Sequence, residues 1–238
     1  MNTALDEPSE NNLKRSARLV SDVHKILKNA NSYGEFATNT ADSKDATHRM
    51  RLFHDQFRLD AHTNRCAGTI YRSQSVIHEQ KIIIGKSANP GLVHCEHAIP
   101  INLIARHIYE NMKSSTMHEL GIFLLFSQFV CAIKKTEQEY LSIKRSYAGI
   151  KKGWVKHHPN FIAGNRLELK SFRGEDIGLS DVLVFARYIG TDITMHCVLT
   201  NECLNVEKYT IADHVSLLKN HRPGIVSAFT ECLKEINP

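Results

Sequence analysis

Hydrophobic residues recur every three or four positions in several stretches of the chain, which is the spacing of one face of an α-helix. In residues 11–29, for example, Leu13, Val20 and Leu27 lie on one stripe, and most of the charged side chains lie off it. The same spacing predicts further helices over residues 46–62, 101–112, 115–129, 136–145, 210–218 and 224–236. We therefore expect a helix-rich chain.

Short apolar or β-branched runs between these helices predict strands. They cover residues 69–73, 81–85, 92–99, 130–133, 182–187 and 193–199. Pro100 ends the run 92–99, because proline has no amide hydrogen to give to a sheet. The mixture of helices and strands predicts the fold class α+β.

One stretch, residues 30–46, is rich in Asn, Ser, Thr, Asp and Ala and predicts a loop or linker. We therefore expect an N-terminal helix and linker over residues 1–45, followed by an α+β domain over residues 46–238.

Composition narrows the class of protein. Hydrophobic residues make up 42% of the 238 positions and charged residues 23%, which is typical of a globular chain. No run approaches the roughly 20 apolar residues of a membrane span. The first residues carry neither a basic segment nor an apolar one, so we expect no secretory signal and a cytoplasmic location. The six cysteines are scattered without a Cys-x-x-Cys pair, which indicates neither a zinc ribbon nor a disulfide scaffold.

Candidate chemistry lies at Glu96-His97, near the end of the predicted strand 92–99. A carboxylate can hold a divalent cation beside a phosphate, and an imidazole can take a proton from the attacking water. Adjacent side chains of a regular strand point to opposite faces, so these two share a site only where the strand bulges or ends. The alternative is an edge strand that carries a surface Glu and a half-buried His.

The segment Glu96-His97-Ala98-Ile99-Pro100 resembles the first motif of the HNH, or ββα-metal, nucleases. In that family a second strand and a helix follow, and the helix supplies another metal ligand. The predicted strand 130–133 and the helix that begins at Thr136 stand in this order, and together they resemble restriction-type HNH enzymes. His158-Pro159 and Arg187-Tyr188-Ile189-Gly190 resemble parts of the same group.

The resemblance implies a ββα-metal core over residues 90–146, within a helix-rich domain. It implies that His97 is the general base and that Glu96 and Glu139 bind Mg²⁺ or Mn²⁺. The implied reaction is hydrolysis of phosphodiester bonds in double-stranded DNA by a type II restriction endonuclease. A homodimer is expected by analogy, because palindromic DNA sites match two-fold symmetry.

The chain also departs from the compact HNH motif. Two apolar helices stand between His97 and the second strand, no middle Asn follows at the usual spacing, and the terminal His is missing. Glu139 has a second interpretation, because Thr136 and Glu139 have the spacing of a helix capping box.

A basic stretch that includes Trp154 follows the second predicted strand and suits contact with a DNA backbone. Its candidate DNA-binding residues are Lys134, Lys135, Lys151, Lys152, Lys156 and His158. The alternative interpretation is a solvated loop. The net charge of +5 favours polyanionic partners only weakly.

Two other functions stay open. Glu168 and Lys170 resemble the second half of a PD-(D/E)xK nuclease motif, although Asn160 stands where the first half needs Asp. The chain could also be a non-catalytic nucleic-acid-binding protein that uses the basic face of the helix over residues 11–29. The spacing of His196, Cys197 and Cys203 fits no standard zinc pattern.

Overall fold

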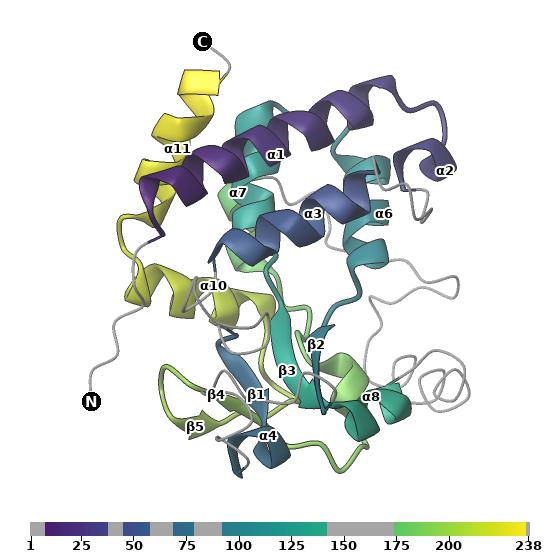
Figure 1. The fold of residues 1–238 in the computed structure, drawn as a ribbon, viewed down its shortest axis with the longest axis vertical. Coiled ribbons are helices and arrows are strands. Elements are labelled where there is room, and N and C mark those ends of the chain that lie inside the picture. The colour runs from purple at the N-terminus through teal and green to yellow at the C-terminus, as the bar shows by residue number, and fades with distance from the viewer. Residues whose placement is uncertain (1–7, 38–44, 58–68, 79–91, 142–173, 237–238) are drawn as a thin grey trace.

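Helices form one part of the molecule and a small sheet forms the other (Figure 1). The computed structural model describes residues 8–37, 45–57, 69–78, 92–141 and 174–236. The predicted α+β class is confirmed, because helices pack together with a five-stranded mixed sheet. None of the helices in these ranges has the length and apolar character that crossing a membrane requires.

Most predicted helices are present, with ends that differ from the prediction by a few residues. The longer ones are α1 (Glu10–Asn29), α3 (Ala46–His54), α6 (Ile101–Asn111), α7 (Met117–Phe126), α10 (Ile211–His221) and α11 (Ile225–Ile236). The shorter ones are α2 (Tyr33–Phe36), α4 (Gln74–His78) and α8 (Lys135–Leu141). The 3₁₀ helices are η1 (Asp55–Phe57), η2 (Gly174–Leu179) and η3 (Ala186–Tyr188).

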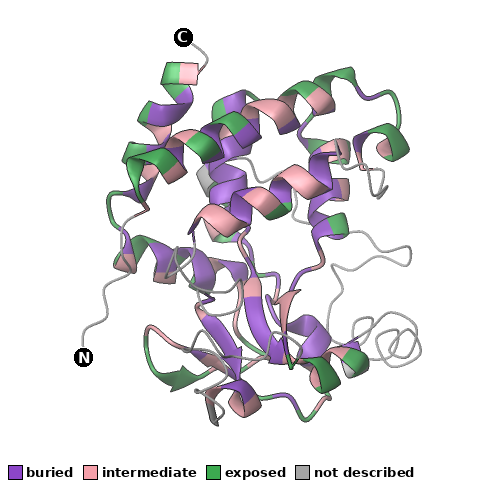
Figure 2. Cartoon of the chain, in the orientation of Figure 1, coloured by how far each residue is buried: buried purple, intermediate pink, exposed green. Residues whose placement is uncertain are grey.

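Helix α1 shows how the apolar stripe sets the packing. Ser9 caps its first turn by accepting a hydrogen bond from the amide of Asn12 at 3.2 Å. The stripe predicted from the sequence is buried, and it packs against α3, α7 and α11. The buried side chains of α1 and those of the later helices therefore belong to one hydrophobic core, and Figure 2 colours the buried positions of these helices purple.

The sheet contains β1 (Tyr71–Ser73), β2 (Val93–His97), β3 (Val130–Lys134), β4 (Met195–Cys197) and β5 (Glu202–Cys203). The strand order is β2-β3-β1-β4-β5, with β1 parallel to β3 and the other pairs antiparallel. Within the part of the chain that is described, β2 is thus an edge strand. Its edge position leaves one side of the candidate segment outside the ladder.

The predicted strand over residues 182–187 is wrong. Leu183 makes only an isolated bridge to Thr210, and the 3₁₀ helix η3 begins at Ala186. The run is apolar because Val182, Val184 and Phe185 fill the core, and burial alone does not distinguish a strand from an irregular buried segment. The strand predicted over residues 81–85 lies outside the described residues.

The order strand, strand, helix that the HNH resemblance implies is present in β2, β3 and α8. Strands β2 and β3 are antiparallel, with Glu96 opposite Cys131 and His97 opposite Val130. Helix α8 follows β3 directly and contacts both strands. Between β2 and β3 the chain forms α6 and α7, and α7 is buried on nearly all sides.

Candidate functional site

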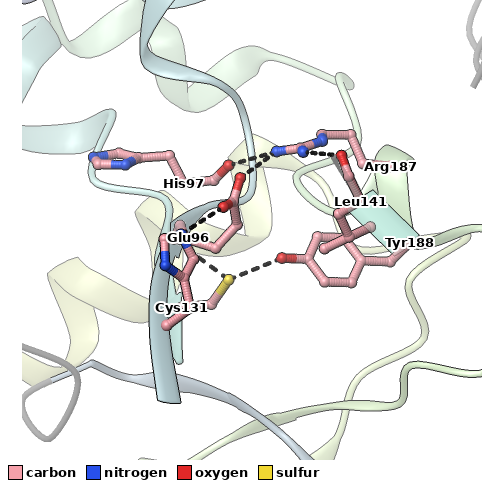
Figure 3. Close-up of polar contacts among 7 residues, drawn as sticks. Glu96, His97, Cys131, Leu141, Arg187 and Tyr188 are labelled. Carbon is pink, nitrogen blue, oxygen red and sulfur yellow. Dashed lines mark hydrogen bonds and ion pairs between the residues drawn. The ribbon is translucent and has the colours of Figure 1, made fainter. Parts of the chain in front are cut away.

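The carboxylate of Glu96 contacts the side chains of Arg187, as Figure 3 shows, and of His94. Arg187 Nη1 is 2.5 Å from Glu96 Oε1, and His94 Nε2 is 3.1 Å from Oε2. His94 and Glu96 share one face of β2 because they are two positions apart in the strand. Only 15% of the Glu96 side chain and 7% of the Arg187 side chain are exposed, so this is a buried ion pair.

Arg187 also binds the backbone at two further points. Its Nη1 donates to the carbonyl of His97 at 3.2 Å, and its Nη2 donates to the carbonyl of Leu141 at 2.7 Å. His97 is the last residue of β2 and Leu141 is the last residue of α8. One guanidinium group therefore ties the end of β2 to the end of α8.

The neighbouring Tyr188 extends this network. Its hydroxyl is 3.0 Å from Cys131 Sγ, and Cys131 Sγ donates to the carbonyl of Glu96 at 3.5 Å. Because the thiol has a single hydrogen, the Tyr188 hydroxyl is the donor in the first contact. Burial raises the pKa of Tyr188 well above its ordinary value, which keeps this donor protonated.

Glu96 stays ionised at neutral pH although it is largely buried. Burial by itself would raise the pKa of this carboxyl, but the hydrogen bond from His94 and the charge of Arg187 outweigh it. The net effect is a pKa below the ordinary value of 4.5. The three side chains His94, Glu96 and Arg187 are called the charged cluster below.

The ring of His97 points away from Glu96, as strand alternation requires (Figure 3). Its Nε2 lies 3.2 Å from His54 Nδ1, and the two ring centroids are 5.3 Å apart. Burial lowers the pKa of His97 to about 4, so the imidazole is neutral at pH 7. The structure thus places Glu96 and His97 on opposite faces of β2, and the expectation that the two side chains share one site is wrong.

Two further histidines accompany His97. Burial, together with the nearby His97 and His214, lowers the pKa of His54 well below 6.5. Burial also lowers the pKa of His214 to about 3, and His214 Nδ1 lies 2.6 Å from the hydroxyl of Tyr71. The residues His54, His97 and His214 are called the histidine cluster below.

Glu139 is exposed on α8. The expected capping box of Thr136 and Glu139 is wrong, because α8 begins at Lys135 and Thr136 lies within it. Glu137 instead accepts the amide hydrogen of Lys134 at 2.7 Å, which satisfies the first turn. Glu137 also accepts hydrogen bonds from Ser73 and Ser75, which joins α8 to β1 and α4.

The ligands for Mg²⁺ or Mn²⁺ are incomplete in the described ranges. There, no three His, Cys, Asp or Glu side chains are grouped to hold a metal ion. Magnesium commonly uses one or two carboxylates and completes its shell with water and phosphate oxygens, so one Glu can begin a site. The charge of Glu96 is, however, already balanced by Arg187. The described residues therefore provide no complete set of ligands for a metal ion.

The predicted DNA contacts divide into two groups. Lys134 is half-buried and Lys135 is exposed, at the junction of β3 and α8. The remaining candidates lie outside the described residues, and so do both residues of the alternative nuclease motif: Lys151, Lys152, Lys156, His158, Glu168 and Lys170.

Sequence reasoning did not identify two important partners. His54 is 43 positions from His97 and lies in an amphipathic helix where it has no distinguishing pattern. Arg187 is 91 positions from Glu96. The family resemblance included Arg187-Tyr188 but did not predict the ion pair with Glu96.

Comparison with models of protein families, with curated proteins and with solved structures finds no match to this chain. The fold and the site by themselves define an α+β protein in which β2 is the edge strand of the described sheet. That strand carries an ion-paired carboxylate on one face and a neutral imidazole pair on the other.

Proposed function

We propose that this chain is an endonuclease that hydrolyses phosphodiester bonds in double-stranded DNA, with His97 as the general base. The observation that carries the proposal is the set of contacts made by Arg187. It binds the Glu96 carboxylate, the backbone of His97 and the last residue of α8.

These contacts matter because the resemblance to HNH nucleases was found in separate parts of the sequence. Glu96-His97, the strand and helix over residues 130–141, and Arg187-Tyr188 each carry a part of this resemblance. In the fold they meet in one network around β2, β3 and α8 (Figure 3). Parts of one active-site region are expected to meet in this way, whereas chance matches have no reason to.

In this proposal, the side chains on the two faces of β2 have different roles. The neutral ring of His97 has one nitrogen beside His54 and a second nitrogen with which to accept a proton from the attacking water. Glu96 and Arg187 hold the strand end that carries His97. Mg²⁺ or Mn²⁺ is the cofactor that the resemblance implies; such an ion would neutralise charge on the scissile phosphate.

The test is a cleavage assay with plasmid and phage DNA in Mg²⁺ and in Mn²⁺. Wild-type protein is compared with His97→Ala, with an EDTA control, and with His118→Ala. His118 is an exposed histidine on α7 that bonds to Thr230 and is a matched control for loss of an imidazole. We expect discrete fragments from wild type and from His118→Ala, and none with EDTA or with His97→Ala.

Two outcomes would contradict the proposal in different ways. DNA that stays intact with every metal and substrate would exclude the nuclease function. Cleavage that His97→Ala leaves unchanged would exclude His97 as the base and would direct the next substitution to Lys170.

The exposed face of α1 favours a second function, which is binding of nucleic acid without cleavage. Arg15, Arg18 and Lys25 are exposed, lie three and seven positions apart on one face, and have no ion-pair partner among the described residues. A phosphate backbone would complement these charges. Exchange of all three for Glu should then weaken DNA binding and flatten its salt dependence, and equal binding by the triple variant would exclude this surface.

A further inference from the structure

The imidazole of His97 is held by a second buried imidazole. His54 is the last residue of α3, is 4% exposed, and its Nδ1 lies 3.2 Å from His97 Nε2. Its ring also packs edge-on against Phe53 at 6.1 Å between centroids. Because α3 packs on α1 and the ring lies in the core, His54 is a fixed partner rather than a mobile one.

A hydrogen bond between two neutral imidazoles contains one hydrogen, so only two arrangements exist. In the first, His97 Nε2–H donates to His54 Nδ1, and the lone pair of His97 is on its Nδ1. In the second, His54 Nδ1–H donates to His97 Nε2, and His97 Nδ1 carries the hydrogen. Only the first arrangement leaves His97 a nitrogen that can take a proton from water.

We propose that His54 is a positioning residue that accepts the Nε2–H of His97 and so fixes the tautomer in which His97 Nδ1 is the basic atom. This inference rests on the proposed role of His97 as the general base. His54 does not touch the reacting atoms; it acts by orienting the ring of His97 and by choosing its tautomer.

In this arrangement the hydrogen of neutral His54 is on its Nε2, a buried atom with no hydrogen-bond partner among the described residues, so the desolvation of this N–H opposes the arrangement. His54 must itself be neutral in order to accept a hydrogen bond at Nδ1, and burial keeps it so. Among the neighbouring groups, Glu96 and Asp55 raise the pKa of His97, whereas Arg51 and His94 lower it. Within the described residues, the side chain of His54 forms a hydrogen bond with the ring of His97.

The first measurement reads the tautomer and needs no DNA. Protein labelled with ¹⁵N-histidine is examined by long-range ¹H–¹⁵N correlation at pH 7, where the two ring nitrogens of each neutral histidine give distinct shifts. The chain has 14 histidines, so signals are assigned by their loss in His97→Gln and His54→Gln. We expect His97 to be protonated at Nε2, and protonation at Nδ1 would overturn the inference.

The second measurement separates positioning from folding. His54→Leu fills the space without an acceptor, whereas His54→Asn retains a carbonyl oxygen close to the position of Nδ1. We expect kcat to fall about 10- to 100-fold in His54→Leu with KM little changed, which is part of the 10²–10⁴-fold effect of a positioned base. In His54→Asn most of this loss should be restored.

The matched control is His107→Leu. His107 is buried on α6, where its ring stacks on Phe123 at 5.4 Å between centroids and bonds to Asn111. Its loss should cost stability and leave kcat near the wild-type value. If His54→Leu does not fold, the wild-type tautomer and the kcat of His54→Asn still decide the question.

Failure of the two proposals would look different. A wild-type protein that cleaves no DNA contradicts the nuclease function. A wild-type protein that cleaves DNA, but has His97 protonated at Nδ1 or keeps full kcat in His54→Leu, contradicts only the role of His54.

Discussion

Glu96 and His97 are neighbours in one strand and both are largely buried, yet Glu96 is ionised and His97 is neutral at pH 7. The charged cluster keeps Glu96 ionised by placing His94 and Arg187 within hydrogen-bond distance of its two oxygens. The histidine cluster contains no ion pair between its members, and its three imidazoles stay neutral because burial lowers the pKa of each. The partners of Glu96 therefore decide its protonation, whereas burial decides the protonation of the three imidazoles.

The difference has a consequence for stability. A buried charge that loses its partner costs several kcal/mol, whereas a neutral hydrogen bond contributes about 0.5–1.5 kcal/mol. The charged cluster should therefore respond strongly to substitution at any pH at which Glu96 is ionised. The histidine cluster should respond mainly to acid.

The largest effect is expected from Arg187→Met. It leaves the Glu96 carboxylate without its principal counter-charge and removes the bonds to His97 and Leu141. We expect the free energy of unfolding, measured by urea denaturation, to fall by about 3–5 kcal/mol. Adding Glu96→Gln should recover part of the loss, because the unpaired charge is gone. A loss below about 1 kcal/mol in the single variant would show that the pair is not buried as described.

Acid should distinguish the histidine cluster from the charged cluster. The folded-state pKa of His214 is about 3, below its ordinary value of 6.5. Below pH 6.5 the unfolded chain therefore binds a proton that the folded protein does not, and stability is lost as the pH falls toward 3. By pH 5 this costs about 2 kcal/mol for this group. The stability that ionised Glu96 contributes is fully present above pH 4.5 and is lost only as the pH falls below that value, because its folded-state pKa is lowered from 4.5.

The measurement is the free energy of unfolding of wild type and His214→Gln between pH 7 and pH 5. The variant should show the smaller decline, and the exposed His118→Gln should decline as wild type does. Parallel curves for wild type and His214→Gln would contradict the assignment of His214 as a buried neutral group.

Local patterns predicted the elements of this fold well, because an apolar stripe is a property of neighbouring positions. The helices α1, α6, α10 and α11 follow directly from such stripes. The pattern wrongly predicted a strand over residues 182–187, where apolar residues are buried without regular strand geometry. The pattern also predicted that Glu139 caps α8, whereas Glu137 accepts the hydrogen bond at the start of the helix. Either Glu can stand at the third helical position when the first helical residue is unknown.

The site was predictable only in part, for a physical reason. Glu96 and His97 could be selected from their chemistry. Strand alternation correctly predicted that their side chains point to opposite faces of β2. Their hydrogen-bond partners, Arg187 and His54, lie 91 and 43 positions away in the sequence. No periodicity connects such positions, because tertiary packing alone brings them together.

The smallest effect is expected where the same chemistry is exposed to water. Lys234 and Glu231 on α11 form an ion pair at 2.7 Å, close to the 2.5 Å of Arg187 and Glu96, but their side chains are 67% and 68% exposed. Water screens this pair in both the folded and the unfolded chain, so Lys234→Ala should change the free energy of unfolding by no more than about 0.5 kcal/mol. The same urea denaturation that measures Arg187→Met checks this. A loss comparable to that of Arg187→Met would mean that the distance between the charges, rather than their burial, determines the cost, and the contrast between the two clusters would then need another explanation.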